Sequence, residues 1–234
     1  MADRTSLSRP GVIGAAVGLT LLASGVAQAH APRLLVFLHV SLKQRAFQSL
    51  LGGSLAGVDV TAVGRIADFE RSLTEAPDAV LTLPLVMAAK NLSPSLRGQR
   101  SGASEERYVL VAADAAPDPA RVKTVGTLDI LGREGTTAFA NRLLGSNTKV
   151  ERVTKVEDLL PLLQMQRVDA ILMPERLIDD VKSGSRLNLV PRPLERLVGL
   201  PALAAIGAGA SAISAGISRL PAKVLQTMGV DSWH

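Results

Sequence analysis

The residues best suited to chemistry lie at positions 132–137, where the sequence runs Gly-Arg-Glu-Gly-Thr-Thr. A stretch of strand character, 122–130, precedes them, and apolar residues follow at helical spacing. A glycine-bearing turn that leads into a helix leaves backbone N–H groups unpaired, with the positive end of the helix dipole behind them. Such a turn is suited to binding an anion. The alternative is that Gly135 and Thr136 only cap a helix, which is a common use of threonine.

Three other turns place polar groups directly after a predicted strand, at about residues 39–41, 82–84 and 173–175. Ligands of open parallel sheets bind beyond the carboxyl ends of the strands, at helix N-termini. Hydroxyl and backbone N–H groups suit a small oxyanion or carboxylate, which needs donors more than a full counter-charge. The predicted ligand-binding residues are therefore His39, Ser41, Thr82, Gly135, Thr136, Thr137, Pro174 and Glu175.

Two of the side chains near these turns have alternative interpretations. His39 is either a ligand contact or a buried histidine that is satisfied within the protein. Arg176 either adds charge to the rim of the site or is a solvated surface residue, and the same holds for Arg133.

Motifs that mark enzymes are missing from the sequence. There is no nucleophile elbow, no H-E-x-x-H pair and no Walker motif. The three histidines are His30, His39 and His234, which do not suffice for a metal site or a serine–histidine–aspartate triad. The chain has no cysteine, which excludes thiolate chemistry and a disulfide framework. We therefore expect no enzymatic activity, no metal ion and no cofactor.

Charge and aromatic content narrow the class of partner. The formal charge is +5, and loss of a leader with Arg4, Arg9 and Asp3 removes two positive charges and one negative, leaving +4. These charges are spread along the chain, without the basic runs and interleaved aromatics of nucleic-acid binding, so we expect no nucleic-acid partner. With one Trp, one Tyr and four Phe, the chain also lacks the aromatic platforms on which many sugars and amino acids bind.

The first 31 residues have the pattern of an export signal. Arg4 and Arg9 precede an apolar run of small residues at 11–26, and Ala27-Gln28-Ala29 is a small-x-small cleavage site. A membrane anchor is the alternative, but the run is interrupted by glycine and serine and is short of the about 20 apolar residues that a span needs. We expect a signal peptide over 1–31 and a periplasmic mature protein.

The remaining chain alternates strand and helix patterns in two series. Strands are predicted at 33–40, 58–63, 78–83 and 107–113, with helices between the first three and a surface loop at 94–106. A second series has strands at 122–130, 150–154 and 168–173, and proline-containing breaks at 114–119 and 191–193 bracket it. Alternation of this kind predicts parallel sheets with right-handed crossovers. A strand at 200–206 and a helix at 212–228 are expected to return to the first series.

The element order, the G-R-E-G-T-T turn and the run V-E-D-L-L-P-L-L-Q-x-x-R-V-D-A-I-L-M-P resemble the type 2 periplasmic substrate-binding proteins of ABC transporters. Within that family the chain is most similar to the phosphate- and phosphonate-like branch. The resemblance implies an α/β fold of two lobes, each a mostly parallel sheet flanked by helices, joined by two crossover strands. Lobe I is then expected at 32–113 and 194–234, and lobe II at 114–193.

The same resemblance implies a monomeric protein that captures a small anionic ligand between its lobes and presents it to an ABC transporter permease. The ligand is expected to be phosphate, phosphonate or a small carboxylate. The alternative is an orphan or sensory protein of the same fold that signals to a membrane sensor such as a histidine kinase. A third possibility is a scaffold whose cleft no longer binds a ligand.

Overall fold

Two β-sheets, each with helices packed on it, make up the part of the chain that the computed structural model describes, residues 30–234. The signal-peptide prediction for 1–31 falls almost entirely outside these residues. Residues Ala31–His234 form one compact unit. No helix within it combines the length and the apolar character that a bilayer span requires.

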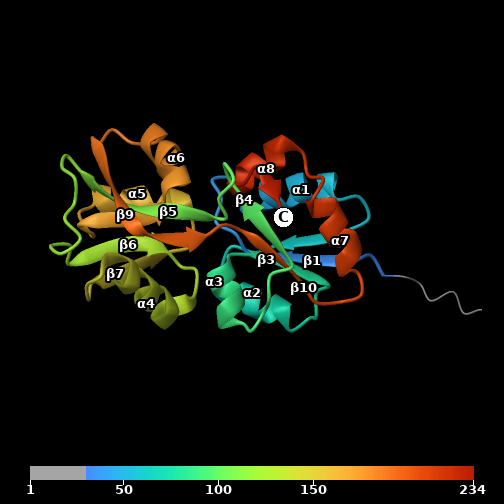
Figure 1. Ribbon diagram of the computed structural model, residues 1–234. Helices are drawn as coiled ribbons and strands as arrows, with labels where there is room; N and C mark the ends of the chain where they lie inside the picture. The colour runs from blue at the N-terminus through green and yellow to red at the C-terminus, as the bar shows by residue number, and fades with distance from the viewer. Residues whose placement is uncertain (1–29) are drawn as a thin grey trace, which may run out of the picture. The chain divides into compact units, whose positions relative to one another are not determined.

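The first sheet has six strands in the order β11-β4-β10-β3-β1-β2. Strand β1 pairs in parallel with β2 and β3, whereas the pairings of β10 and β4 are antiparallel. Figure 1 shows that chain segments from both ends of the sequence, in blue and in red, build this half. Its elements are β1 (Arg33–Val36), α1 (Gln44–Ser54), β2 (Asp59–Ala62), α2 (Ile66–Leu73), β3 (Ala79–Thr82), α3 (Pro84–Ala89), β4 (Leu96–Gln99), β10 (Ala202–Ala205), α7 (Ala210–Ile217), α8 (Ala222–Met228) and β11 (Ser232–Trp233).

The second sheet has five strands in the order β7-β6-β8-β5-β9. Strand β6 pairs in parallel with β7 and β8, and β5 pairs antiparallel with β8 and β9. Each sheet is thus parallel over three strands and antiparallel elsewhere, which makes both sheets mixed. The elements are β5 (Glu105–Ala113), β6 (Thr124–Leu128), α4 (Gly132–Leu144), β7 (Lys149–Val153), the 3₁₀ turn η1 (Val156–Asp158), α5 (Leu159–Gln164), β8 (Ala170–Pro174), the 3₁₀ turn η2 (Glu175–Leu177), α6 (Ile178–Ser183) and β9 (Leu189–Gly199).

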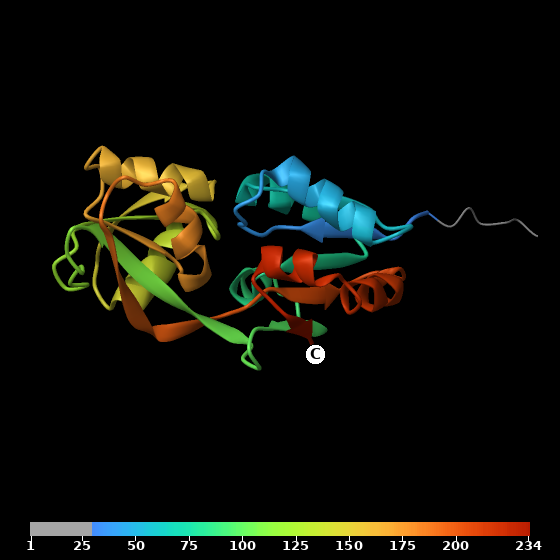
Figure 2. The same cartoon turned by 90° about the horizontal axis from the view of Figure 1, so that it is seen from above.

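The paired strands β5 and β9 carry the chain between the two sheets, and Figure 2 shows them side by side. The sequence assigned residues up to 113 to lobe I, but the strand partners of β5 all belong to the second sheet. The break predicted at 191–193 is also wrong, because these residues lie inside β9. Strand β9 is at the edge of its sheet, where proline is tolerated because one side of the strand needs no ladder hydrogen bonds.

Two further predictions at the level of elements need correction. The loop predicted at 94–106 contains β4, in which Gly98 allows a close backbone approach: a Cβ there would lie 2.8 Å from the carbonyl oxygen of Pro201. The helix predicted at 212–228 is two helices, because Pro221 cannot continue α7 and instead precedes α8.

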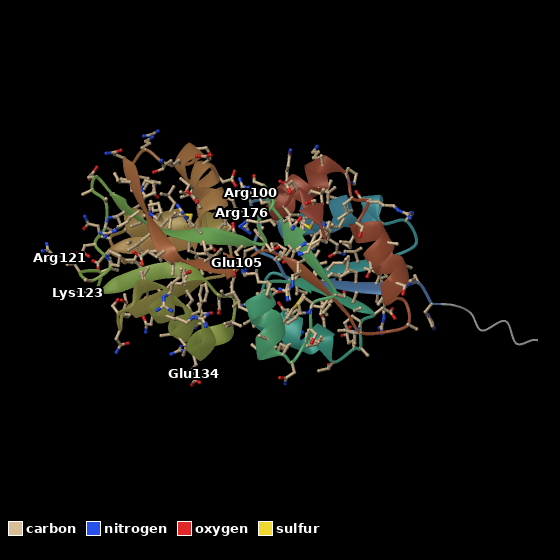
Figure 3. The ribbon with its side chains drawn as sticks, viewed as in Figure 1. Arg100, Glu105, Arg121, Lys123, Glu134 and Arg176 are labelled. Atoms are coloured by element: carbon tan, nitrogen blue, oxygen red, sulfur yellow. The ribbon has the colours of Figure 1, made fainter. Side chains whose placement is uncertain are left out.

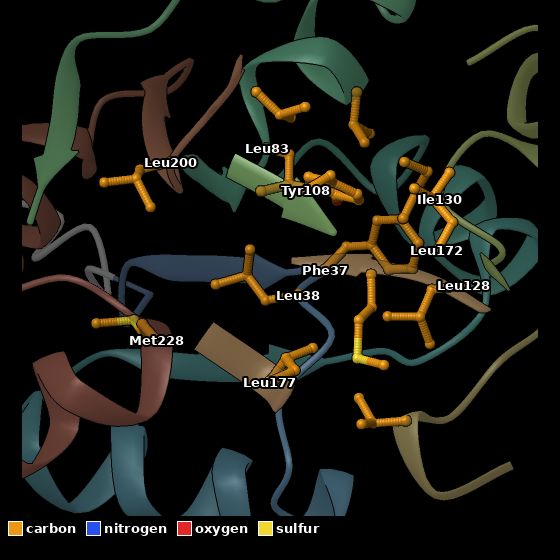
Figure 4. Close-up of a cluster of buried hydrophobic side chains, with 14 of the residues drawn as sticks. Phe37, Leu38, Leu83, Tyr108, Leu128, Ile130, Leu172, Leu177, Leu200 and Met228 are labelled. Carbon is orange, nitrogen blue, oxygen red and sulfur yellow. The ribbon is translucent and has the colours of Figure 1, made fainter. Parts of the chain in front are cut away.

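The buried apolar side chains of both sheets belong to one continuous cluster. Figure 4 shows Phe37, Leu38 and Leu83 from the first half beside Tyr108 and Ile130 from the second. The apolar contact between the halves therefore includes the strand ends at which the sequence analysis expected polar ligand contacts.

Candidate functional site

A cavity of about 460 Å³ is bounded by both halves of the protein. The first half contributes the connection from β1 to α1 and the turn after β2. The second half contributes the turn between β7 and η1. The cavity lies where strands β1, β2 and β7 end, which is where parallel sheets place their ligands. Its lining residues are Val36, Leu38, His39, Val40, Ser41, Leu42, Lys43, Gln44, Arg45, Phe47, Ala62, Val63, Gly64, Thr154, Lys155, Val156 and Glu157.

His39 is a wall residue of this cavity and is kept uncharged near neutral pH. Its Nε2 atom is buried and has no hydrogen-bond partner within the protein, and its ring meets that of Phe37 edge-on at 5.2 Å between centroids. Burial, and secondarily the positive charge of Arg176, lowers the pKa of His39 to about 4. A neutral imidazole offers one donor and one acceptor, so His39 is suited to hydrogen bonding and not to charge pairing.

The polar side chains next to His39 are occupied within the protein. The Ser41 hydroxyl donates to the carboxylate of Asp180, and α1 begins after Lys43. The Gln44 amide donates to the carbonyl oxygen of Ala62. These bonds fix the loop that enters α1 and leave few uncommitted neutral donors at the cavity.

The Gly-Arg-Glu-Gly-Thr-Thr turn is not part of the cavity lining. The Thr136 side chain is fully buried: its hydroxyl accepts a hydrogen bond from the Leu131 N–H at 2.9 Å and donates to Asp129 at 3.0 Å. Asp129 in turn forms an ion pair with Arg152 at 2.5 Å. Thr136 lies inside α4, which begins at Gly132, and its hydroxyl ties the helix to Leu131 and to the residue after β6, a structural role and not that of an N-cap.

The neighbouring glycine and threonine also serve the local structure. A Cβ on Gly135 would lie 2.6 Å from the Cβ of Leu131, so glycine is required for the close packing of the first helical turn. The Thr137 hydroxyl donates to the carbonyl oxygen of Arg133 at 2.7 Å. Neither Gly135 nor Thr137 lines the cavity that contains His39 and Ser41.

The remaining predicted site residues lie apart from the cavity as well. Thr82 is fully buried, and its hydroxyl donates to the Phe37 carbonyl oxygen at 2.8 Å. Pro174 ends the buried strand β8, and Glu175 is an exposed residue that begins η2. Of the eight predicted residues, the structure therefore brings only His39 and Ser41 to the cavity.

A buried ion pair lies beside this site. The Nη1 atom of Arg176 is 3.3 Å from Oε1 of Glu106, and the two side chains are 8% and 7% exposed. Burial raises the pKa of Glu106 although the charge of Arg176 opposes the rise. Arg176 also packs against Gly229 at the C-terminus of α8, where a Cβ would overlap its Cδ and Nε atoms. Arg176 is therefore a structural contact between the halves, and it does not line the His39 cavity.

A second cavity, of about 510 Å³, lies on the other side of Ser41 and Leu42. Figure 3 shows Arg100 and Arg176, two of its lining residues, close together. Its cations, Arg100, Arg176 and Lys223, are matched in number by the carboxylates of Asp180, Asp231 and the nearby Glu106. This balance favours neither an anionic nor a cationic ligand in the second cavity.

The sequence analysis missed the residues that give the cavity its character: the basic Lys43, Arg45 and Lys155, and the apolar Val63 and Val156. The same rule that identified His39, that ligands bind beyond strand ends, also applies to the turns after β2 and β7, so these two turns were identifiable from the strand pattern. Within residues 30–234, no three histidine, aspartate or glutamate side chains gather closely enough to hold a metal ion.

Comparison with solved structures identifies the fold. The substrate-binding protein of an amino acid ABC transporter is 15% identical, with a TM-score of 0.55, and the match covers 79% of this chain and 89% of that one. A histidine kinase sensor domain that resembles periplasmic binding proteins is 15% identical, with a TM-score of 0.56 and coverage of 86% and 92%. The glutamate-bound ligand-binding core of GluR0 from Nostoc punctiforme is 11% identical, with a TM-score of 0.54 and coverage of 80% and 91%.

The chain has the two-lobed fold of periplasmic binding proteins. This confirms the fold class expected from the sequence. No family model and no curated protein matches the chain. These three structures are an amino acid transporter's binding protein, a glutamate-bound core and a histidine kinase sensor domain. None of the three is a phosphate- or phosphonate-binding protein, so they do not support that branch of the family.

Proposed function

We propose that this protein is an exported solute-binding protein that holds a small anionic solute in the His39 cavity. The observation that carries the proposal is that one cavity is walled by both halves, by residues 36–47 and 62–64 of the first and 154–157 of the second. A solute bound there contacts both halves at once, so its binding energy favours the closed arrangement over the open one. The volume, about 460 Å³, is in the range of small-molecule sites.

The charges of the lining support an anionic solute. Lys43, Arg45 and Lys155 are cationic, whereas Glu157 is the single carboxylate of the lining and lies 3.6 Å from the Lys155 ammonium. Phosphate, phosphonate and a small carboxylate are the anions that we expect to compete for the site. Delivery of the solute to an ABC permease is the role that we propose, in keeping with the similar protein of an amino acid ABC transporter.

Sensing is the second candidate role, and the likeness to a histidine kinase sensor domain favours it. The solute site is the same in both roles, and only the membrane partner differs. Genes for a permease and an ATPase next to this gene would support transport, and a histidine kinase gene would support sensing.

A pair of matched variants tests the site. Val63→Trp places an indole in the cavity, whereas Val58→Trp places one at a half-buried valine at the other end of the same strand region, outside the lining. Each protein is titrated with a panel of anions, and the melting temperature is recorded, because a ligand that binds only the folded state raises it. We expect wild type and Val58→Trp to respond to the same anion and Val63→Trp not to respond. An equal response of all three proteins would refute the site.

A further inference from the structure

The walls of the His39 cavity differ in chemistry from its rim. Eight of the lining residues are apolar: Val36, Leu38, Val40, Leu42, Phe47, Ala62, Val63 and Val156. They come from β1, the connection from β1 to α1, α1, the end of β2 with the residue after it, and η1, so apolar surface faces the cavity from both halves. A bare oxyanion seated against these walls would lose hydration without gaining donors in return.

Two of the four neutral polar side chains in the lining, those of Ser41 and Gln44, are already committed within the protein; the other two are His39 and Thr154. Ser41 donates to Asp180 and Gln44 donates to Ala62. Among the lining side chains, His39 retains a buried nitrogen without a partner. One neutral imidazole and one threonine hydroxyl are a small donor set for a phosphate, whose oxygens need several hydrogen bonds.

The charged lining residues also disfavour a zwitterion. The ammonium group of an amino acid needs a carboxylate partner, and Glu157, the only one in the lining, pairs with Lys155. Lys43 and Arg45, at the start of α1, are exposed, and their long side chains can reach an anionic group held at the mouth of the cavity. The lining thus has cations at its exposed edge and apolar walls behind them.

We propose that the solute is a monocarboxylate with an apolar alkyl or aryl body. The body occupies the space between the valine and leucine side chains of the β1–α1 connection, the turn after β2 and η1, and the carboxylate lies toward Lys43 and Arg45. This inference rests on the proposed function, because it names the solute class of the same site.

Calorimetric titration of the full chain with a homologous series tests the inference. The series is acetate, butanoate and hexanoate, and the comparison probes are 6-aminohexanoate, hexanol, glutamate and inorganic phosphate. We expect the affinity to rise about fourfold with each methylene group, which is the equivalent of about 0.8 kcal/mol of apolar burial. Both 6-aminohexanoate and hexanol should bind at least about tenfold more weakly than hexanoate, since the first adds an unpaired charge and the second lacks the carboxylate.

Charge variants locate the carboxylate. The double variant Lys43→Gln, Arg45→Gln should weaken hexanoate binding by about tenfold, and Lys123→Gln, at an exposed lysine of the second half outside the lining, should leave it unchanged. Tighter binding of phosphate or glutamate than of hexanoate would overturn the apolar-carboxylate inference while the proposed binding function stood. Binding of hexanol as tight as that of hexanoate would overturn the carboxylate part. The absence of heat with every probe at two well-separated temperatures would overturn both proposals, because the heat-capacity change of apolar burial makes the heat of binding vary with temperature.

Discussion

Gly229 and Gly145 give a matched test of the buried contact between the two halves. Both are C-terminal caps of helices, α8 and α4, in the left-handed region, with φ of 79° and 67°. Alanine at either position therefore incurs the left-handed backbone cost of about 1 kcal/mol. The two differ in their surroundings: a Cβ at Gly145 meets nothing within 4 Å, whereas a Cβ at Gly229 overlaps Arg176.

Gly229→Ala must displace Arg176, and the cost of that displacement follows from the ion pair. The Glu106 side chain is 7% exposed and lies 3.3 Å from Arg176. Removal of one partner from a buried ion pair costs about 3–5 kcal/mol, because the other charge stays buried. We expect Gly229→Ala to lower the free energy of unfolding by about 3 kcal/mol more than Gly145→Ala does.

Chemical denaturation of the two variants, followed by circular dichroism, measures this difference. In the background Glu106→Gln, Arg176→Ala, the extra cost of Gly229→Ala should vanish, because the overlapping side chain and the buried carboxylate are both gone. Equal losses for Gly229→Ala and Gly145→Ala in the wild-type background would refute the reasoning, since Arg176 would then not occupy the space above the α8 cap.

Three other predictions concern His39 in the cavity wall and two polar side chains outside the cavity that fix turns of the second half. Because the pKa of His39 is lowered to about 4 from 6.5, the folded state binds fewer protons than the unfolded state between these values. The contribution of His39 to the free energy of unfolding is complete above pH 6.5 and falls by about 1.4 kcal/mol per pH unit toward pH 4. Chemical denaturation at a series of pH values should show a smaller slope of unfolding free energy against pH for His39→Gln than for wild type. Thr136→Ala should cost about 1–3 kcal/mol of unfolding free energy by leaving buried partners of its hydroxyl unsatisfied, whereas Thr137→Ala should cost under about 1 kcal/mol; comparable losses in denaturation would contradict this. Asp169→Ala should cost about 1–3 kcal/mol, since its carboxylate accepts from the N–H groups of Lys123 and Thr124, each at 2.9 Å; an unchanged melting temperature would contradict it.

The element pattern was predictable because it depends on local periodicity. Helix α2 lies between the second and third strands, where the sequence predicts a helix, and the Val-Asp-Ala run at 168–170 leads into a buried strand as expected. Asp169 fixes the turn before that strand through its hydrogen bonds to the backbone. Strand β4 was missed because its polar, glycine-containing sequence forms a strand only through long-range pairing with β10 and β11, and β11 was missed because it is only two residues long.

The candidate site was harder to predict than the fold. A threonine after a glycine turn has the same local sequence whether its hydroxyl faces a ligand or bonds within the protein, and for Thr136 the positions of Asp129 and Leu131 decide between the two. The serine of the β1–α1 loop is likewise committed by Asp180, which is 139 residues away in sequence. Site residues therefore depend on tertiary partners that spacing along the chain does not reveal.

A crystal structure of the protein with its co-purified or added carboxylate tests the central claim most directly. The account predicts ligand density in the cavity between residues 39–45 of the first half and 154–157 of the second. Density confined to the Arg100 and Arg176 cavity, or to the Thr136 turn, would contradict it.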